Sequence, residues 1–262
     1  MSFDFGIAAA GLAVGFVVGL TGMGGGALMT PMLILLFRVP PLAAVSSDLV
    51  ASLVMKPVGG GVHYRRGTVR TDLVKWLVLG SVPTAFAGAA FVGTIGASHI
   101  DAFLRQALGV ALVLTATTML VRPLIERYRN RHDTESAATA PASAPAIRPL
   151  ATLAIGALGG LIVGITSVGA GSLIIALLVL LYPTLRVAEL VGTDLVQAIP
   201  LVASAALGHL LFGDVRAAVT VSLLAGALPG VYMGARISSR APDYIVRPVL
   251  VLVLAGTGLK LI

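Results

Sequence analysis

Two glycine-rich segments are the first features of this sequence that could do chemistry. They read Thr21-Gly22-Met23-Gly24-Gly25-Gly26 and Thr166-Ser167-Val168-Gly169-Ala170-Gly171. Glycine allows unusual dihedral angles and close backbone approach. A helix is predicted to begin after each segment, near Ala27 and Ser172, and a helix N-terminus has unpaired N–H groups that favour an anion. The two segments therefore indicate an anion site, and the alternative is that their glycines only let helices pack closely.

Two aspartates stand near the start of long apolar stretches. They occur in Ser46-Ser47-Asp48-Leu49 and Gly192-Thr193-Asp194-Leu195. An ionisable group at membrane depth is costly and marks a functional site by default. Asp48 and Asp194 could carry protons or orient donors around a substrate, and the alternative is that they cap their helices.

Lys56 is the one Lys or Arg well inside a long apolar stretch, and Pro57 follows it. It lies eight residues after Asp48, on a roughly similar helix face. Lys56 could bind an anion or pair with Asp48, or its side chain could extend to the membrane interface. Gln197 is a weaker polar candidate in the second half of the chain. His63 and His209 could relay protons or could be interface residues at helix ends.

Ten apolar stretches must position these groups. They cover residues 5–21, 27–37, 42–62, 72–92, 100–121, 149–166, 172–182, 187–211, 217–235 and 242–261. A straight membrane span needs about 20 residues, and the first, second, sixth and seventh stretches are shorter. Each short pair surrounds a glycine-rich segment, so each is either a re-entrant helical hairpin or two tilted, broken spans.

The composition supports a membrane protein. Of the 262 residues, 57% are hydrophobic and 11% are charged, whereas a soluble domain carries about 25% charged residues. We therefore predict an all-α polytopic membrane protein and exclude a nucleic-acid-binding domain and an ordinary soluble enzyme. The sequence has no cysteine, and its four histidines have no metal-ligand spacing, so we expect no cofactor and no metal. The start of the chain lacks the basic region of a signal peptide, so residues 5–21 are predicted to stay as a helix.

The two halves of the chain resemble each other. At shifts of 145 and 146 residues, Gly, Thr, Asp, His, Arg and Pro recur in the same order, and Asp48, for example, matches Asp194. We predict transmembrane repeats at 1–122 and 149–262, joined by a flexible linker at 123–148 that is rich in Ala, Pro and Ser. Each half has an odd number of crossings, so the repeats are predicted to be inverted, as in secondary transporters.

The basic residues orient the chain. If the linker is cytoplasmic, thirteen Lys and Arg residues lie in cytoplasmic gaps and four lie outside. The outer four are Arg38, Arg105, Arg216 and Lys260. This bias follows the positive-inside rule and predicts both termini outside.

The motifs resemble the TauE/SafE family of sulfite and organosulfonate exporters. The resemblance rests on Gly22 to Gly26 followed by Pro31, and on the Asp48 motif with its echo around Asp194. It covers nearly the whole chain apart from 123–148. It implies a carrier of small sulfur-containing anions in the bacterial inner membrane. Family members usually carry a hydroxylated or Gly-Thr cluster before the third helix, and Ser46-Ser47 stands in that place here.

Our sequence-based prediction is an alternating-access exporter of sulfite or organosulfonates with a site between the repeats. The predicted substrate-binding residues are Thr21, Gly22, Met23, Gly24, Gly25, Gly26, Ser47, Lys56, Thr166, Ser167, Gly169, Gly171, Thr193 and Gln197. Asp48 and Asp194 are predicted to couple transport to protons or sodium. An anion channel and a carrier of carboxylates are alternatives, and an intramembrane enzyme or an assembly factor is a third hypothesis. Beyond the anion, the coupling ion and the lipid bilayer, no partner is predicted.

Overall fold

The described part of the chain is helical throughout. The computed structural model describes residues 3–21, 25–65, 69–96, 99–136, 147–169, 171, 173–183, 185, 187–237 and 243–262, and no strand occurs among them. The helices are α1 (Phe5–Thr21), α2 (Gly26–Leu35), α3 (Pro41–Arg65), α4 (Thr71–Thr94), α5 (Ile100–Ser136), α6 (Pro149–Thr166), α7 (Leu173–Leu181), α8 (Val187–Phe212), α9 (Ala217–Ile237) and α10 (Asp243–Leu261).

These helices form because apolar segments in lipid must satisfy their backbone groups internally. Within the described residues, five helical segments are long and apolar enough to cross a membrane. They cover 71–94, 100–120, 149–166, 189–212 and 217–234. The chain is therefore a multi-pass membrane protein.

The observed helices follow the predicted apolar stretches closely, with one difference. Most ends agree within about two residues, and both short pairs are present as α1 with α2 and α6 with α7. α5, however, continues to Ser136, into the range predicted to be a flexible linker. Residues 123–136 contain three Arg and two Glu, which favour helix formation. Residues 137–146 of the predicted linker lie outside the described residues.

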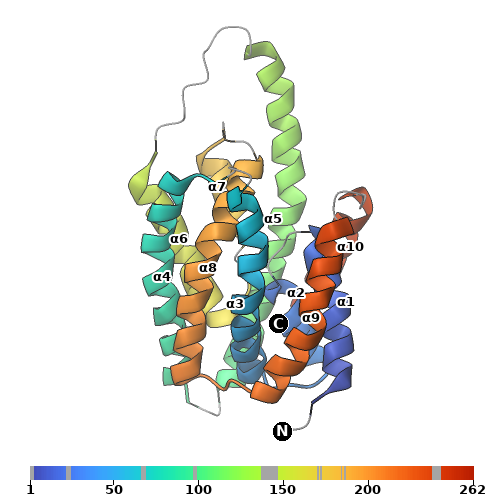
Figure 1. Ribbon diagram of the computed structural model, residues 1–262. Coiled ribbons are helices and arrows are strands. Elements are labelled where there is room, and N and C mark those ends of the chain that lie inside the picture. Colours follow the sequence, from blue (N-terminus) through green and yellow to red (C-terminus); the bar gives the residue numbers. More distant parts are fainter. Residues whose placement is uncertain are drawn as a thin grey trace.

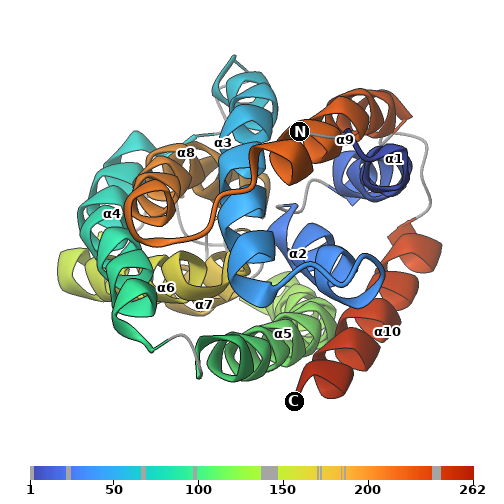
Figure 2. The same cartoon turned by 90° about the horizontal axis from the view of Figure 1, so that it is seen from below.

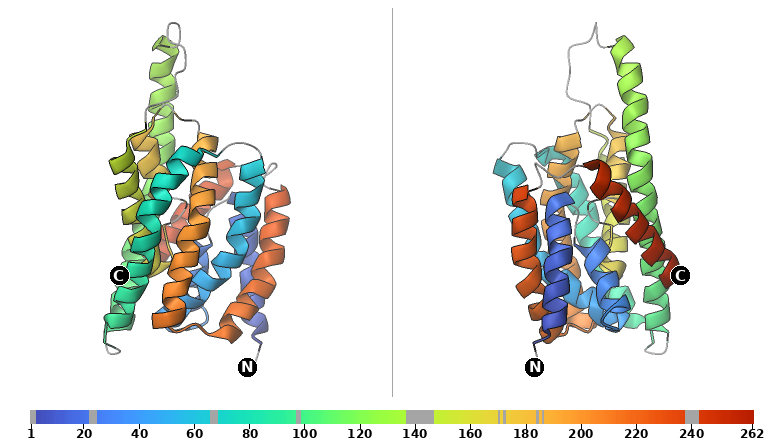
Figure 3. Two further views of the ribbon diagram at one scale, coloured as in Figure 1. Left: turned by 60° about the vertical axis from the view of Figure 1, so that its left-hand side comes forward. Right: turned by 90° about the vertical axis from the view of Figure 1, so that its right-hand side faces the viewer.

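The helices pack in pairs that join the two halves of the chain. α1 packs along α9, α6 packs along α4, and α3 packs against α8 between these two pairs (Figures 1 and 2). α5 and α10 lie side by side. The short helix α7 lies toward the end from which α5 projects, whereas α2 lies toward the opposite end, where the N-terminus is found (Figures 1 and 3).

Glycines allow the closest of these helix contacts. A Cβ atom on Gly226 of α9 would overlap the carbonyl oxygen of Ala8 on α1, and a Cβ atom on Gly80 of α4 would overlap that of Leu153 on α6. Gly80 and Gly226 are equivalent at the 146-residue shift, and Ala8 and Leu153 at the 145-residue shift. Small residues that bring backbones together are typical of helix interfaces in membranes.

A pair of matched substitutions tests this packing. Gly226→Ala should lower the melting temperature of the detergent-solubilised protein, because separating α9 from α1 costs about 1–3 kcal/mol. Gly256→Ala is the control, since Gly256 is also within a helix but has no neighbouring atom within 4 Å of its would-be Cβ. Because alanine favours helix more than glycine does, this control should leave the melting temperature unchanged or raise it. Equal melting temperatures for the two variants would contradict the proposed contact.

Candidate functional site

The two glycine-rich segments meet inside the protein. α2 begins at Gly26, and a Cβ atom on Gly26 would overlap the backbone carbonyl of Ser167, which ends α6. Ser167 adopts the left-handed conformation, with φ 62°, which turns the chain sharply after α6. The N-terminal end of α2 therefore lies directly against the C-terminal end of α6, from the other half of the chain.

Asp48 links this junction to α3. Its Oδ2 atom accepts hydrogen bonds from Ser167 Oγ at 2.6 Å and from Thr30 Oγ1 at 2.8 Å. The side chain has no solvent exposure, and Oδ1 has no hydrogen-bond partner among the described residues. One carboxylate thus joins α2, α3 and the end of α6, and one of its oxygens is still available to a ligand, a cation or a proton.

Asp194 occupies the equivalent position on α8. Its Oδ1 atom accepts a hydrogen bond from Gln197 Nε2 at 2.9 Å, and Gln197 Oε1 accepts one from Ser81 of α4 at 3.2 Å. Asp194 is buried, and its Oδ2 atom has no hydrogen-bond partner in the described part of the chain. Both aspartates therefore have one bonded oxygen and one unpartnered oxygen.

Lys56 lies on α3, the same helix as Asp48. Its side chain is half-buried, and it interacts electrostatically with both Asp48 and Asp194. The equivalent residue in the second half is Val202, which is buried and apolar. The structure thus places one cation near two buried carboxylates, and the second half has no matching cation at this position.

The chain turns tightly after Thr166, at the start of the second glycine-rich segment. Thr166 Oγ1 donates to the carbonyl oxygen of Ile162 at 2.7 Å and accepts from the N–H of Val168 at 3.2 Å. Gly169 and Gly171 have φ values of 113° and 119°, which other residues rarely adopt. The Thr166 hydroxyl therefore holds the turn in place.

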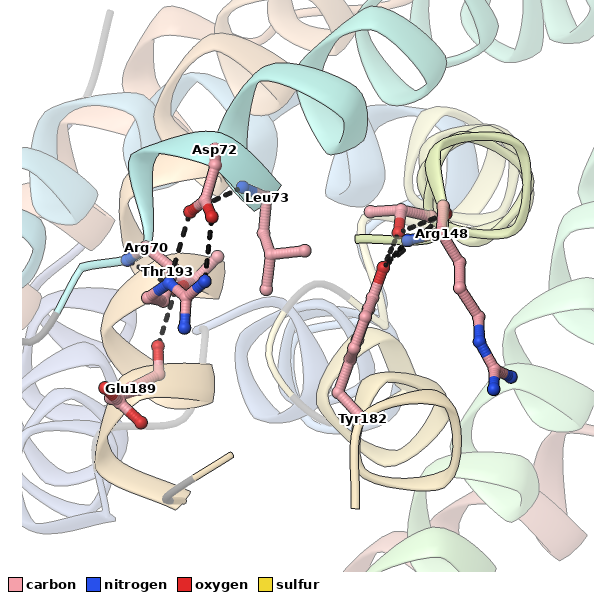
Figure 4. A network of polar contacts seen from close by, with 8 residues as sticks. Arg70, Asp72, Leu73, Arg148, Tyr182, Glu189 and Thr193 are labelled. Atoms are coloured by element: carbon pink, nitrogen blue, oxygen red, sulfur yellow. Dashed lines mark hydrogen bonds and ion pairs between the residues drawn. The ribbon is translucent and has the colours of Figure 1, made fainter. Parts of the chain in front are cut away.

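Ser47 and Thr193 occupy equivalent positions but lie away from this junction. Thr193 Oγ1 accepts a hydrogen bond from the backbone N–H of Arg70 at 3.0 Å and donates to the carbonyl oxygen of Glu189 (Figure 4). Ser47 Oγ likewise accepts from the backbone N–H of Arg216 at 3.2 Å. Arg70 and Arg216 directly precede α4 and α9. Each hydroxyl thus fixes the start of a helix from the other half of the chain.

Charged pairs stabilise these helix starts. Arg70 forms an ion pair with Asp72 at 2.8 Å, and Arg216 forms one with Asp214 at 3.1 Å. Near Arg70, the Tyr182 hydroxyl accepts a hydrogen bond from the backbone N–H of Arg148 at 2.8 Å (Figure 4). This bond holds the start of α6 in place. These contacts are structural, because none of them involves the glycine-rich junction.

Part of the predicted site lies outside the described residues. Gly22, Met23 and Gly24 belong to this part, and Thr21 is described only as the last residue of α1. Gly25 directly precedes α2, and its carbonyl accepts the first hydrogen bonds of that helix, from the N–H groups of Leu28 and Met29.

Two hydroxyls that were not expected from the sequence donate hydrogen bonds to the predicted acidic and amide side chains. Thr30 and Ser81 lie within apolar helices, and only the fold brings them to Asp48 and Gln197. A buried hydroxyl inside an apolar stretch is a signal that could have identified both. Among the described residues, no group of three or more His, Asp or Glu could hold a metal ion.

His209 joins three helices and is almost fully buried. Its Nε2 atom lies 2.8 Å from the Gly164 carbonyl oxygen, and its Nδ1 atom lies 2.8 Å from Ser46 Oγ. A carbonyl only accepts hydrogen bonds, so Nε2 is the donor, and Nδ1 of the neutral ring accepts from Ser46. His209 is therefore not an exposed residue at a membrane interface. The side chain of His63, the equivalent residue in the first half, lies outside the described part of the structure.

Sequence comparisons relate the chain to membrane transporters. The family described as sulfite exporter TauE/SafE matches residues 7–261. The chain is 34% identical to "Probable membrane transporter protein YjnA" of Bacillus subtilis (strain 168), over 96% of this chain and 97% of that protein. It is 25% identical to "Probable membrane transporter protein YdhB" of the same organism, over 95% of this chain and 96% of that protein. No solved structure matches the chain.

Proposed function

Because this chain belongs to the sulfite exporter TauE/SafE family and is a membrane transporter, we propose that it exports small sulfur-containing anions such as sulfite or organosulfonates. The contact between the two glycine-rich segments, hydrogen-bonded to Asp48, which in turn interacts with Lys56, is the observation that carries this proposal. A transporter needs a binding site deep within the membrane, and broken helices are a common way to build one.

The two halves form inverted repeats in this proposal. The helix packing supports it, because α1 and α6 are equivalent in the two halves, as are α4 and α9. α1 packs on α9, and α6 packs on α4. The bonds of Ser47 to Arg216 and of Thr193 to Arg70 support it in the same way. The short pairs then enter the membrane as hairpins from opposite sides, and one half moves against the other during alternating access. The linker faces the cytoplasm of a bacterial inner membrane, and both termini lie outside.

The anion binds at the start of α2 in this proposal. The N–H groups of Gly26 and Ala27 precede the first hydrogen bonds within that helix, so they can donate to sulfite or sulfonate oxygens. Lys56 supplies positive charge, and Gly169 and Gly171 form the opposite wall from the second half. The unpartnered oxygens of Asp48 and Asp194 bind the coupling proton or sodium ion, because a buried carboxylate needs such a partner.

Transport assays with purified protein in proteoliposomes test this function. Uptake of labelled sulfite or taurine should saturate and show counterflow, whereas flux that never saturates would indicate a channel. Saturable uptake of simple carboxylates alone would contradict the sulfur specificity.

Gly25→Val should lower this flux without unfolding the protein. Among the described residues, the atoms nearest to a Cβ atom at Gly25 belong to the side chains of Met29 and Met55, at 3.1 and 3.6 Å, and these flexible side chains can move. The branched side chain would nevertheless cover the N-terminal end of α2. We expect at least about a tenfold loss of transport, since one charge-assisted hydrogen bond is worth that much. A melting temperature close to that of the wild type is the control, and normal flux in this variant would refute the placement of the anion.

A further inference from the structure

A pocket lies beside the start of α5, away from the end of α5 that projects from the molecule. It has a volume of about 460 Å³ and is lined by residues at the end of α2, in the loop between α2 and α3, at the start of α5 and at the end of α10. Figure 2 shows how these elements are arranged. Its polar lining residues are Arg38, Arg105, Lys260 and Asp101, and the remainder is apolar side chains from residues 34–41. This volume is within the usual range for small-molecule sites.

The charges of this pocket are not paired with one another. Arg38, Arg105, Lys260 and Asp101 are all exposed, and within the described residues none of them forms an ion pair within 4 Å. Asp101 lies in the first turn of α5, where the helix dipole stabilises a carboxylate. Three cations from three separate segments thus surround one space, with a single acidic residue beside them.

The backbone at Arg38 is unusual. Arg38 has a φ of 53°, and the Val39 N–H donates to the Leu33 carbonyl oxygen at 3.0 Å, six residues back. A left-handed residue just after the end of a helix is usually glycine. An arginine here keeps a cation at the pocket despite an unfavourable conformation, which is a pattern typical of binding sites.

From these observations we infer that the pocket binds an oxyanion of the sulfate, sulfonate or phosphate class. Arginine binds such groups through paired N–H donors, and the apolar wall can contact an attached alkyl chain. Pro41 on this wall is the first residue of α3 and lies seven residues from Asp48, which is about 10 Å along the helix. The pocket is therefore separate from the junction of the glycine-rich segments, and its assignment does not depend on the proposed transport function.

Sulfate titration of the protein in neutral detergent tests this site, with the melting temperature as the readout. Arg38→Gly and Arg105→Gln should each weaken sulfate binding at least about tenfold, the effect of losing a charge-assisted hydrogen bond. Asp101→Asn should strengthen binding, because among the described residues that line the pocket it removes the one acidic side chain. Arg38→Gly should also keep or raise the melting temperature without sulfate, since glycine adopts the left-handed backbone freely, so its effect cannot come from misfolding.

Two controls make the result specific. Lys75→Gln removes an exposed cation of α4 that does not line the pocket, and it should leave sulfate binding unchanged. Each titration is repeated in protein that also carries Lys56→Ala. This substitution weakens sulfate binding at the proposed transport site, so the remaining rise in melting temperature comes from the pocket.

The source of the oxyanion is resolved by native mass spectrometry of protein from nanodiscs that contain phosphatidylglycerol. Phosphatidylglycerol that stays bound to the wild type but is lost from Arg38→Gly and Arg105→Gln, without a response to sulfate, would identify a lipid headgroup as the ligand. A sulfate response without lipid retention would identify a free anion. If both variants match Lys75→Gln in sulfate affinity and in lipid retention, the inference is wrong.

Discussion

Lys56→Ala should reduce the kcat/KM for anion transport by about tenfold or more, which corresponds to the loss of one charge-assisted hydrogen bond. Lys56 is the half-buried cation that interacts with both Asp48 and Asp194, and Val202 occupies the equivalent place in the other half. Without Lys56, an incoming anion would meet the negative charge of two buried carboxylates without the cation that interacts with both. Initial rates of labelled sulfite uptake in proteoliposomes measure the effect.

Two further variants distinguish the charge of Lys56 from its packing. Lys56→Met keeps an apolar chain of similar length and should behave like Lys56→Ala, whereas Lys56→Arg should retain part of the activity. If Lys56 only offsets the two aspartates, Lys56→Met will lower the melting temperature and leave the KM for the anion unchanged. That outcome would refute contact with the substrate.

Asp48→Ala should destabilise the protein by about 1–3 kcal/mol and abolish transport. The hydroxyls of Ser167 and Thr30 would lose their shared acceptor, and hydrogen bonds to a charged acceptor are worth about 1.5–3 kcal/mol each in water-soluble proteins and less in membranes. The contact between the two glycine-rich segments would also lose its link to α3. The melting temperature in detergent and the uptake rate measure the two effects.

Asp48→Asn separates this structural role from ion coupling. Its amide oxygen can still accept hydrogen bonds from Ser167 and Thr30, so we expect a fold and an anion exchange close to those of the wild type. Asparagine cannot carry a proton, so accumulation driven by a pH or sodium gradient should be lost. Asp194→Asn is the matched variant in the second half. Gradient-driven accumulation that persists in both variants would exclude these carboxylates as the coupling groups.

Much of the fold could be predicted from the sequence because membrane helices depend on local composition. The apolar stretches predicted the first and last residues of most helices to within about two residues, and this includes both short pairs. The end of α5 was the exception, because the proline- and serine-rich linker composition begins only after a segment of good helix formers. The family resemblance was likewise carried by local motifs around Asp48 and Asp194, and the comparison over residues 7–261 confirmed it.

The candidate site was only partly predictable because hydrogen-bond partners come from distant segments. Asp48 and Asp194 were expected to be buried, and both are. The partners Thr30 and Ser81 were not expected, since each is an isolated hydroxyl within an apolar helix. Ser47 and Thr193 were expected to bind substrate, yet their hydroxyls accept the backbone N–H groups of Arg216 and Arg70. Their substrate role stays a prediction.

The sequence by itself determined that this protein is a multi-pass helical membrane transporter, because hydropathy and motif spacing are local properties of the chain. The tertiary structure decided which of the local features meet. Gly26 packs against Ser167, and Ser167 donates a hydrogen bond to Asp48 of the other half. Arg38, Arg105 and Lys260 line one pocket. These residues come from positions up to 222 apart in the sequence, and helix packing across the two halves brings them together.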